Sequence, residues 1–543
     1  MLLFALAVAG CSSDLEGSPE PPGSPPRAAA KPAYGDTFVD SLLGDISGLI
    51  PNILSDAPSF EIAGQLYNGL VTRDRDLNLI GDLAESWTFS QDCLDLTFKL
   101  RRNARWHDNR PFTADDVLFT YETMINPKTP TSYREDFVAV ERVDVVDPLT
   151  VYVRYKKPYA KALQTWEIWI LPRHVLEPYV TAGKLREAPQ NWTHPVGTGP
   201  YRFAERRAGE KVVLLDNEEY FAGRPYISRR VYRIIPSQAT IFLELKARGI
   251  DGASLTALQY KRQSDYPAFR KAYHKYRYAA SVYTYLGFNN KGPKFTDRRV
   301  RQAIAHAINK RELIEGVRLG LGSEATGPYK PGTWAYTADV KTYPYDLKQA
   351  QQLLAEAGWT EKNADGLLVK DGRPFTFELM TNQGNDERKK VAEIVQASLK
   401  EIGIGVEIRI LEWATLLKEY VKKRRFEAIV LGWGIGQDPD QYEIWHSSKM
   451  GPDDLNHISY ANPEVDALLE KGRSSCQQAE RVPSYHRLQQ ILAEDQPVVF
   501  LFFRDDLPAI SSRVYGIAPG PNGIRYNLPQ WYVPAPLQRY TAG

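Results

Sequence analysis

Cysteine and histidine are scarce in this chain, with three cysteines and eight histidines among 543 residues. So few histidines, and no His-rich tract, argue against a dedicated metal site, and the sequence indicates no cofactor. Cys93 and Cys476 are the cysteines of the chain body, and they stand far apart in the sequence. We expect two separate thiols there rather than a structural disulfide.

An excess of charge of either sign is also missing, because 68 Lys and Arg residues face 66 Asp and Glu residues and leave a formal charge of +2. Without a long-range field, nucleic acid is not an expected partner. The proportions of 43% hydrophobic and 25% charged residues are typical of a folded globular protein. Single hydrophobic cores stop growing at about 250–300 residues, so this length predicts at least two lobes.

The start of the chain differs from its body. An apolar run ends in Val8-Ala9-Gly10-Cys11, which resembles the bacterial lipobox, where a signal peptidase cuts and the cysteine thiol receives lipid. Residues 1–11 are therefore predicted to be a signal peptide with Cys11 as the lipidation site; an ordinary apolar N-terminus is the alternative. Residues 12–33, rich in Pro, Ser, Gly and Ala, predict a flexible linker. This implies a periplasmic or cell-envelope protein that is lipid-anchored to the membrane.

Hydrophobic periodicity predicts alternating helices and strands along the chain body. Alternating apolar residues favour strands at 94–100, 375–379 and 406–410, and helical spacing favours helices at 113–125 and 386–401. The last three of these segments in chain order form a β-α-β unit. The predicted fold class is therefore α/β.

One strand and the glycine-rich segment after it mark a candidate binding site. Residues 426–431 are apolar except for Glu427, as expected for a strand covered on both faces, and a helix is predicted just before it at 414–421. Gly432-Trp433-Gly434 is predicted to open as a loop at the carboxyl end of this strand. Ligands of open α/β sheets bind beyond strand carboxyl ends, so we expect the loop at the site.

Several short blocks follow one another along the chain in a fixed order: Gln65–Leu70, Leu83–Trp87, Phe98–Arg101, Trp106–Asp108, Pro111–Val117, Gly197–Tyr201, Phe288–Asn289, Asp297, Val300–Ala303, Asp438–Asp440 and Trp445–Ser448. Together they resemble family 5 of the bacterial extracellular solute-binding proteins, the dipeptide- and oligopeptide-binding group. No single block is decisive, but their order and spacing are highly specific. The resemblance covers nearly everything after residue 34.

The resemblance implies a two-lobed periplasmic-binding-protein fold of type II, similar to cluster C. Such a fold has mixed sheets, a hinge of two crossovers and an extra inserted domain. The crossovers are expected around Tyr285 to Asn289 and Phe500 to Arg504. The implied segments are lobe I from 34–70, 196–285 and 501–543, inserted domain II from 71–195, and lobe III from 286–500.

By the same resemblance, the protein is expected to be no enzyme but the extracytoplasmic substrate-binding protein of an ABC transporter. It would capture di- to oligopeptides between its lobes for import, and a ligand that touches both lobes stabilises the closed form. The chain has no transmembrane bundle and no G-x-x-x-x-G-K-[ST] phosphate loop. Permease subunits and their ATPase are therefore expected as separate partners of a monomer.

A peptide of unspecified sequence offers only its backbone and termini as constant features, so a general binder is expected to pair with it as an added strand. The resemblance places Ser55-Asp56-Ala57 on the lobe I side of the ligand and Gly432-Trp433-Gly434 on the lobe III side. Trp413 matches a tryptophan that lines the family's pocket. For Trp413 and Trp433, packing in a core is the alternative.

One position departs from the family. Related binders commonly carry an aspartate three residues beyond the tryptophan, where it pairs with the α-amino group of the ligand, and here that position is Gly436. An unpaired buried ammonium is costly. Either Asp438 or Asp440 takes over, or the ligand has no free amino terminus at that point. We favour a structural role for Asp440 and leave Asp438 open between a ligand contact and a turn.

Three other interpretations stay open. The same fold binds oligosaccharides, metal chelates or opines in other members of the family. An envelope hydrolase would need more than the adjacent His107 and Asp108, because no G-x-S-x-G or H-E-x-x-H motif is present. A receptor that reports occupancy to a sensor needs the same closing clamp as a transport protein.

Overall fold

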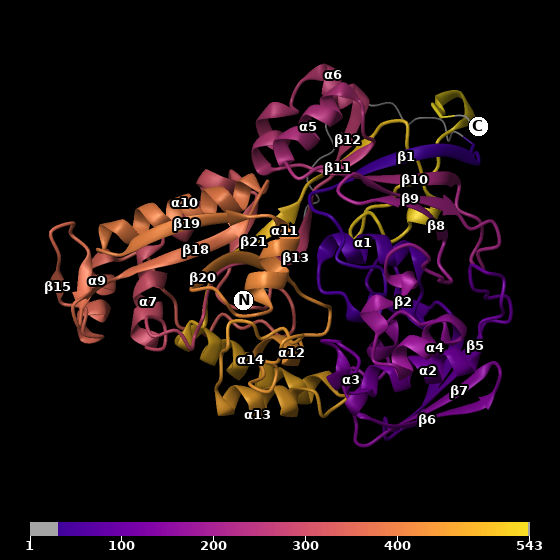
Figure 1. Cartoon of the computed structure of the whole chain (residues 1–543), viewed down its shortest axis with the longest axis horizontal. Helices are drawn as coiled ribbons and strands as arrows, with labels where there is room; N and C mark the ends of the chain where they lie inside the picture. Colours follow the sequence, from indigo (N-terminus) through magenta and orange to yellow (C-terminus); the bar gives the residue numbers. More distant parts are fainter. Residues whose placement is uncertain (1–30, 541–543) are drawn as a thin grey trace, which may run out of the picture.

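The structure is a computed structural model that describes residues 31–540 (Figure 1). The predicted signal peptide at 1–11 with Cys11, and residues 12–30 of the predicted linker, lie outside the described residues. Among residues 31–540, no helix is both long enough and apolar enough to span a membrane. The names lobe I, domain II and lobe III follow the segments predicted above, except that residues 278–285 and 501–506 are counted with lobe III, whose sheet they join.

A six-stranded mixed sheet forms the centre of lobe III, at the left of Figure 1. Its order is β14 (Gly322–Glu324), β21 (Val498–Asp506), β13 (Tyr278–Phe288), β20 (Ala428–Gly434), β18 (Thr376–Asn382) and β19 (Gly405–Leu411). β18 and β19 are parallel and are joined by α10 (Asp386–Glu401), so the predicted β-α-β unit is confirmed. The Asn385 side chain starts α10 because it accepts a hydrogen bond from the Arg388 backbone N–H, at 3.0 Å.

Both faces of this sheet are covered. Ala428 and Val430 of β20 point into one core, and Ile429 and Leu431 point into another, which explains why the sequence of this strand is a continuous apolar run. The first core also holds residues of α7 (Arg298–Ala307), α9 (Leu347–Glu356) and α10. The second holds residues of α12 (Tyr442–Trp445), α13 (Pro463–Gly472) and α14 (Gln478–Asp495).

The prediction of a loop at Gly432-Trp433-Gly434 is wrong. β20 begins at Ala428, two residues later than predicted, and continues through Gly434. The cause is the length of β13, whose eleven residues run past the apolar segment and pair Tyr283 with Trp433. The preceding helix is confirmed as α11 (Trp413–Thr415) with a π-helical continuation at Leu416–Val421.

β13 and β21 pair with each other and also carry the chain between lobes. The residues predicted as crossovers, 285–289 and 500–504, lie largely inside the six-stranded sheet. β12 (Tyr273–Lys275) and β22 (Pro508–Ser511) already belong to a sheet of lobe I. The chain therefore passes between the sheets at 276–277 and at Leu507, closer to lobe I than predicted, because strand pairing extends to the ends of β13 and β21.

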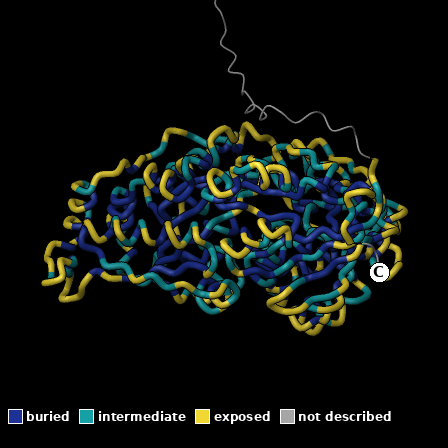
Figure 2. The backbone as a smooth tube through the Cα atoms, turned by 90° about the horizontal axis from the view of Figure 1, so that it is seen from above, coloured by how far each residue is buried: buried dark blue, intermediate teal, exposed yellow. Residues whose placement is uncertain are grey.

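Lobe I, at the upper right of Figure 1, contains two sheets. The larger has the order β1 (Gly35–Leu42), β10 (Ile227–Ile234), β9 (Lys211–Asp216) and β8 (Tyr201–Arg207), and the smaller places β22 between β11 (Gly252–Ser254) and β12. The helices of this lobe are α1 (Ala57–Leu66), α5 (Gln238–Ala247) and α6 (Pro267–Ala272). Buried residues continue through the interior of both lobes (Figure 2).

Domain II, at the lower right of Figure 1, has its own core around a four-stranded sheet. The order is β4 (Ala84–Phe89), β5 (Asp95–Leu100), β7 (Thr150–Tyr155) and β6 (Val140–Asp147), beside the hairpin of β2 (Val71–Arg73) and β3 (Leu79–Gly81). The helix predicted at 113–125 is confirmed as α2 (Ala114–Ile125), with Thr113 and Asp116 forming a capping box. Two further helices are α3 (Arg134–Val138) and α4 (Arg173–Thr181).

The remaining elements are short and lie in connections. Lobe III carries α8 (Lys310–Leu313) and a small sheet of β15 (Glu361–Lys362), β16 (Leu368–Lys370) and β17 (Arg373–Pro374). The 3-10 and π segments are Pro51–Ile53, Gln164–Glu167, Leu185–Glu187, Pro189–Asn191, Gln259–Gln263, Ile314–Arg318, Leu528–Gln530 and Ala535–Leu537.

The expectation of two separate thiols is wrong. Cys93, in the turn between β4 and β5, forms a disulfide with Cys476, in the connection from α13 to α14, with the two Cα atoms 6.7 Å apart. This separation lies within the range that a disulfide spans. Distance along the sequence was a poor guide because domain II and lobe III meet in space, and the bond joins them covalently.

Removing this bond is expected to lower thermal stability. A cross-link over so long a loop restricts the unfolded chain, and disulfides typically contribute about 2–4 kcal/mol. We expect Cys476→Ser to lower Tm by a few degrees in differential scanning calorimetry, and Cys93→Ser to give the same shift.

The double variant is the control, since either single change already removes the bond and the shifts should not add. Peptide mapping of unreduced protein after alkylation gives a direct check. Alkylated Cys93 and Cys476 in the native protein would contradict the disulfide.

Candidate functional site

A cavity of about 520 Å³ lies between the lobes. Its walls come from lobe I at 55–60, from domain II at 133–164, and from α10, β20 and residues 435–444 of lobe III. Two other hollows, of about 620 and 1000 Å³, contain none of the residues predicted to bind ligand. All nine predicted residues line the interlobe cavity: Ser55, Asp56, Ala57, Trp413, Gly432, Trp433, Gly434, Gly436 and Asp438.

The end of β20 offers an open backbone edge to this cavity. Beyond the strand, Ile435 donates its backbone N–H to the Ser281 carbonyl oxygen at 2.7 Å. In an antiparallel ladder, hydrogen-bonded pairs alternate with non-bonded pairs, so Gly432 and Gly434 direct their backbone groups away from β13. β18 pairs with β20 only near the start of that strand. On the side away from β13, no described strand therefore covers Gly432 or Gly434.

The lobe I wall begins at the N-terminus of α1. The Asp56 carboxylate caps this helix by accepting a hydrogen bond from the Ser59 backbone N–H, at 3.0 Å, and another from the Ser47 hydroxyl. Burial raises the pKa of Asp56 above its ordinary value. Its side chain thus has a structural task, and it holds Ser55 and Ala57 at the cavity.

Two tryptophans form aromatic parts of the wall. The Trp433 ring stacks on His457 with centroids 5.3 Å apart, and the Arg388 guanidinium lies 5.8 Å from the Trp413 ring centroid. Both indoles are partly buried against the second core of lobe III, so they serve core and cavity at once. The buried Trp413 Nε1 donates to no residue in the described part of the chain.

A smaller pocket of about 70 Å³ adjoins the cavity and shares both tryptophans with it. Leu417, Val421 and Leu431 give it an apolar lining. His457 also lines it, and burial lowers the pKa of this imidazole to about 3, so the ring is neutral. The pocket suits an apolar group of a ligand.

The two aspartates considered as replacements at Gly436 are both engaged. Asp438 pairs with Arg481 at 2.6 Å, and Asp440 pairs with Arg473 at 2.7 Å. The structural role expected for Asp440 therefore agrees with the geometry. Asp438 lines the cavity but its charge is already paired.

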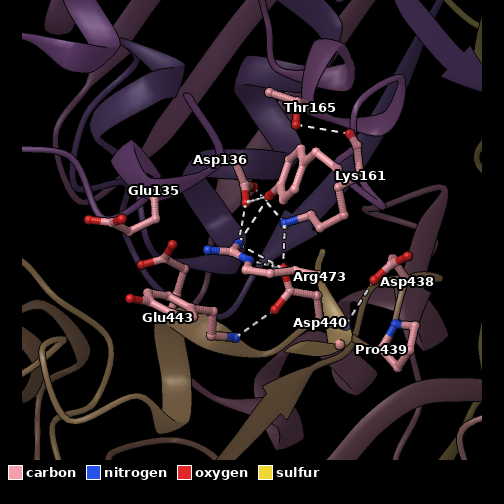
Figure 3. Close-up of polar contacts among 12 residues, drawn as sticks. Glu135, Asp136, Lys161, Thr165, Asp438, Pro439, Asp440, Glu443 and Arg473 are labelled. Atoms are coloured by element: carbon pink, nitrogen blue, oxygen red, sulfur yellow. Dashed lines mark hydrogen bonds and ion pairs between the residues drawn. The ribbon is translucent and has the colours of Figure 1, made fainter. Parts of the chain in front are cut away.

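Asp440 belongs to a group of charges that joins lobe III to domain II (Figure 3). Arg473 of lobe III reaches Asp136 of domain II at 2.9 Å, and its guanidinium lies 4.3 Å from the Tyr442 ring centroid. Ala160 also donates its backbone N–H to the Arg473 carbonyl oxygen at 3.0 Å. We call this group the interlobe charge cluster; its members are Glu135, Asp136, Lys161, Asp440, Glu443, Lys449 and Arg473.

Burial and pairing shift the protonation of this cluster. Burial works against the Asp136 carboxylate, but the charges of Lys161 and Arg473 outweigh it and lower the pKa of Asp136. Glu443 differs, because burial raises the pKa of its carboxyl group to about 8 and the nearby Lys449 only partly offsets this. Glu443 is thus the acid of the cluster whose ionised form is least favoured.

Sequence reasoning missed Glu443 and Arg388. Arg388 is half-buried, and its guanidinium donates to Asn382 Oδ1 at 2.8 Å. Burial and the neighbouring Arg504 lower the pKa of Arg388 to about 10. No carboxylate in the described part of the chain forms a salt bridge with it within 4.0 Å. The rule that placed ligands beyond strand carboxyl ends would have found it, since α10 follows β18 directly.

His107 and Asp108 do not form a catalytic pair. His107 lies beside two backbone groups, with its Nε2 3.1 Å from the Gly199 carbonyl oxygen and its Nδ1 accepting from the Gly197 N–H. Burial lowers the pKa of His107 to about 4. Asp108 instead contacts His174 at 2.7 Å.

Residues 78–453 match the family described as bacterial extracellular solute-binding proteins, family 5 Middle. This chain belongs to family 5. The oligopeptide-binding protein AppA of Bacillus subtilis is 32% identical over 540 residues, which are 98% of this chain and 97% of that protein. The structure of AppA in complex with a nonapeptide superposes with a TM-score of 0.88 and covers 93% of this chain and 100% of that one.

Other family 5 structures are also similar. NikZ from Campylobacter jejuni in complex with Ni(L-His) is 28% identical with a TM-score of 0.83, and covers 92% of this chain and 99% of that one. The periplasmic binding protein DppA from Helicobacter pylori in complex with the peptide STSA is 26% identical with a TM-score of 0.82, at the same coverages. The predicted α/β periplasmic-binding-protein fold is confirmed. Family 5 consists of binding proteins rather than enzymes.

The raised pKa of Glu443 predicts how the ligand-free protein responds to pH. A carboxyl group whose pKa rises from 4.5 to about 8 on folding stabilises fully below the lower value and loses this contribution as pH rises through the higher one. Between these two pH values, we expect the free energy of unfolding to fall by up to roughly 1.4 kcal/mol for each pH unit. Glu443→Gln removes the titrating group.

The measurement is Tm by calorimetry on protein stripped of ligand, between about pH 5 and pH 9. Wild type and Glu443→Gln should agree at the acid end, and the variant should be more stable at the alkaline end. Glu464→Gln is the matched control, because Glu464 pairs with Arg487 and contacts neither Lys449 nor the cavity. A difference in Tm that does not change with pH would refute this assignment.

Proposed function

We propose that this family 5 protein captures a small peptide between its lobes and delivers it to an ABC importer. The peptide is held as an added strand on the free edge of β20. Gly432 and Gly434 supply the backbone groups, and Ser55 and Ala57 face them from lobe I. Domain boundaries at 70/71 and 195/196 are part of this proposal, and boundaries at 277/278 and 506/507 replace 285/286 and 500/501 so that β13 and β21 belong whole to lobe III.

The observation that carries the proposal is the uncovered edge of β20 inside the interlobe cavity. An extended backbone is the ligand feature that such an edge recognises. The pocket beside Trp433 then takes an apolar side chain, and Arg388, which forms no salt bridge with the described carboxylates, suits a carboxylate of the ligand. Peptides combine all three features, and AppA, the relative described above, is an oligopeptide-binding protein.

Delivery requires partners on separate chains. We propose permease subunits with an ATPase as the docking partners, and a monomer held at the membrane of the cell envelope through lipid on Cys11. A peptide that contacts both lobes favours their closed arrangement, and that arrangement is what the importer recognises. The ligand of NikZ, Ni(L-His), makes a metal chelate the main alternative for the cavity.

Native mass spectrometry tests the proposal on protein purified without denaturation. We expect retained peptides of mixed sequence, because contacts to the backbone do not depend on side chains. Recovery of only sugars, opines or metal complexes would reject the peptide assignment.

Trp433→Ala is expected to weaken binding of the retained peptides by more than about 1 kcal/mol, measured by isothermal titration calorimetry. The indole forms part of the cavity wall and of the adjoining pocket. Trp359→Ala is the matched control, because Trp359 packs in the core of lobe III away from the cavity. Equal affinities of Trp433→Ala and wild type would remove Trp433 from the site.

A further inference from the structure

The interlobe charge cluster has one more acid than it has cations. It holds four carboxyl groups, from Glu135, Asp136, Asp440 and Glu443, against three cations, from Lys161, Lys449 and Arg473. Hydrogen bonds join the cations to only three of the acids. Lys161 bonds to Asp136 at 2.6 Å, Lys449 to Glu135 at 2.7 Å, and Arg473 to both Asp136 and Asp440.

Glu443 is the acid left over. It is 9% exposed, and neither carboxylate oxygen accepts a hydrogen bond from any residue within the described range 31–540. Lys449 lies 3.6 Å away, beyond hydrogen-bond distance, because its ammonium is turned to Glu135. Glu443 and Glu135 lie on the same side of Arg473 (Figure 3).

Glu443 also lines the interlobe cavity, whereas Glu135 does not. A buried carboxylate without a donor is costly, and cost falls when a cation with N–H groups reaches it. Among residues 31–540, Lys449 forms an ion pair with Glu443 at 3.6 Å, but no N–H group donates a hydrogen bond to this carboxyl group. The remaining source is the content of the cavity.

We infer that Glu443 is the subsite for a protonated amine of the ligand. This rests on the proposed function and adds to it that the peptide enters with a cationic nitrogen directed at α12. That nitrogen is either the amino terminus of the peptide or a lysine side chain. Glu443 forms a charge-assisted hydrogen bond with it and does not interact through Asp438 or Asp440, which keep their arginine partners.

Binding of an amine changes the protonation of the subsite. Without the amine, the carboxyl group of Glu443, with a pKa of about 8, holds a proton at neutral pH. The carboxylate form is needed to accept from an ammonium, so this proton leaves to solvent as the ligand enters. At Glu443 the ammonium forms an N–H···O hydrogen bond and no covalent bond. The released proton balances the positive charge that the ammonium brings.

The closing experiment uses the whole protein and a synthetic library of short peptides. The library has four arms of equal concentration: free amino termini with lysine, free amino termini with norleucine in its place, and the N-acetylated form of each. Native mass spectrometry measures which arms remain bound to wild type, Glu443→Gln and the control variant Glu464→Gln. Removal of a charge-assisted hydrogen bond typically costs a factor of ten or more, about 1.5–3 kcal/mol.

We expect wild type and Glu464→Gln to prefer an amine-bearing arm over the amine-free arm by about tenfold or more, and Glu443→Gln to lose this preference. Preference for free termini with norleucine identifies the α-ammonium, and preference for acetylated lysine peptides identifies the side chain. If Glu443→Gln keeps the preference, or wild type shows none, the subsite is refuted while peptide binding stands. If wild type retains no peptide at all, the proposed function fails and the subsite with it.

A second measurement, of proton release on binding, can be made on the wild-type protein before any variant is prepared. Calorimetry of one retained peptide, in two buffers that differ in ionisation enthalpy, reports the protons released per peptide bound. We expect about one proton released at pH 6.5 for wild type and none for Glu443→Gln, because the amine of the peptide is already protonated at this pH. The absence of proton release from wild type at this pH would overturn the assignment of Glu443 even if both proteins fold alike.

Discussion

The pairing of β13 with β21 is the interaction on which the rest of the molecule depends. These two antiparallel strands form the middle of the lobe III sheet, and the chain continues from them directly into the smaller sheet of lobe I. Both connections between the lobes therefore leave from one rigid ladder. β20 pairs with β13 as far as Gly434. The same ladder therefore holds the free edge of β20 at the cavity, opposite lobe I and domain II.

The cavity combines a backbone edge with charges that the protein leaves without a full set of partners. Asp438 and Asp440 are neutralised by arginines, while Glu443 and Arg388 on different walls are not paired in this way. Buried charged groups are tolerated when an opposite charge pairs with them. Groups that lack such a partner therefore indicate which charges the ligand carries. The aromatic surfaces of Trp413 and Trp433 complement them, because flat rings accept many shapes.

Local patterns predicted single elements, and the resemblance to family 5 predicted the two-lobed fold, but neither predicted all of the site. The capping box of α2 and the β-α-β unit around α10 depend on neighbours within a few residues, and both were predicted. The extent of β20 depended on the length of β13, about 150 residues earlier in the chain, and was missed. The same limit applies to Cys93 with Cys476 and to Glu443 with Lys449 and Glu135, whose meeting requires the lobes to be placed first.

The interlobe charge cluster has a consequence for empty copies of the protein. Arg473, Lys161 and Lys449 bridge the lobes through their own carboxylate partners, whatever the cavity contains. Part of the free energy that keeps the lobes together is thus intrinsic, and a vacant copy spends some of its time shut. A docking partner that recognises only the closed conformation therefore binds ligand-free copies as well as ligand-bound ones. How often the docking partner meets an empty copy then depends on ion pairs that form without any ligand.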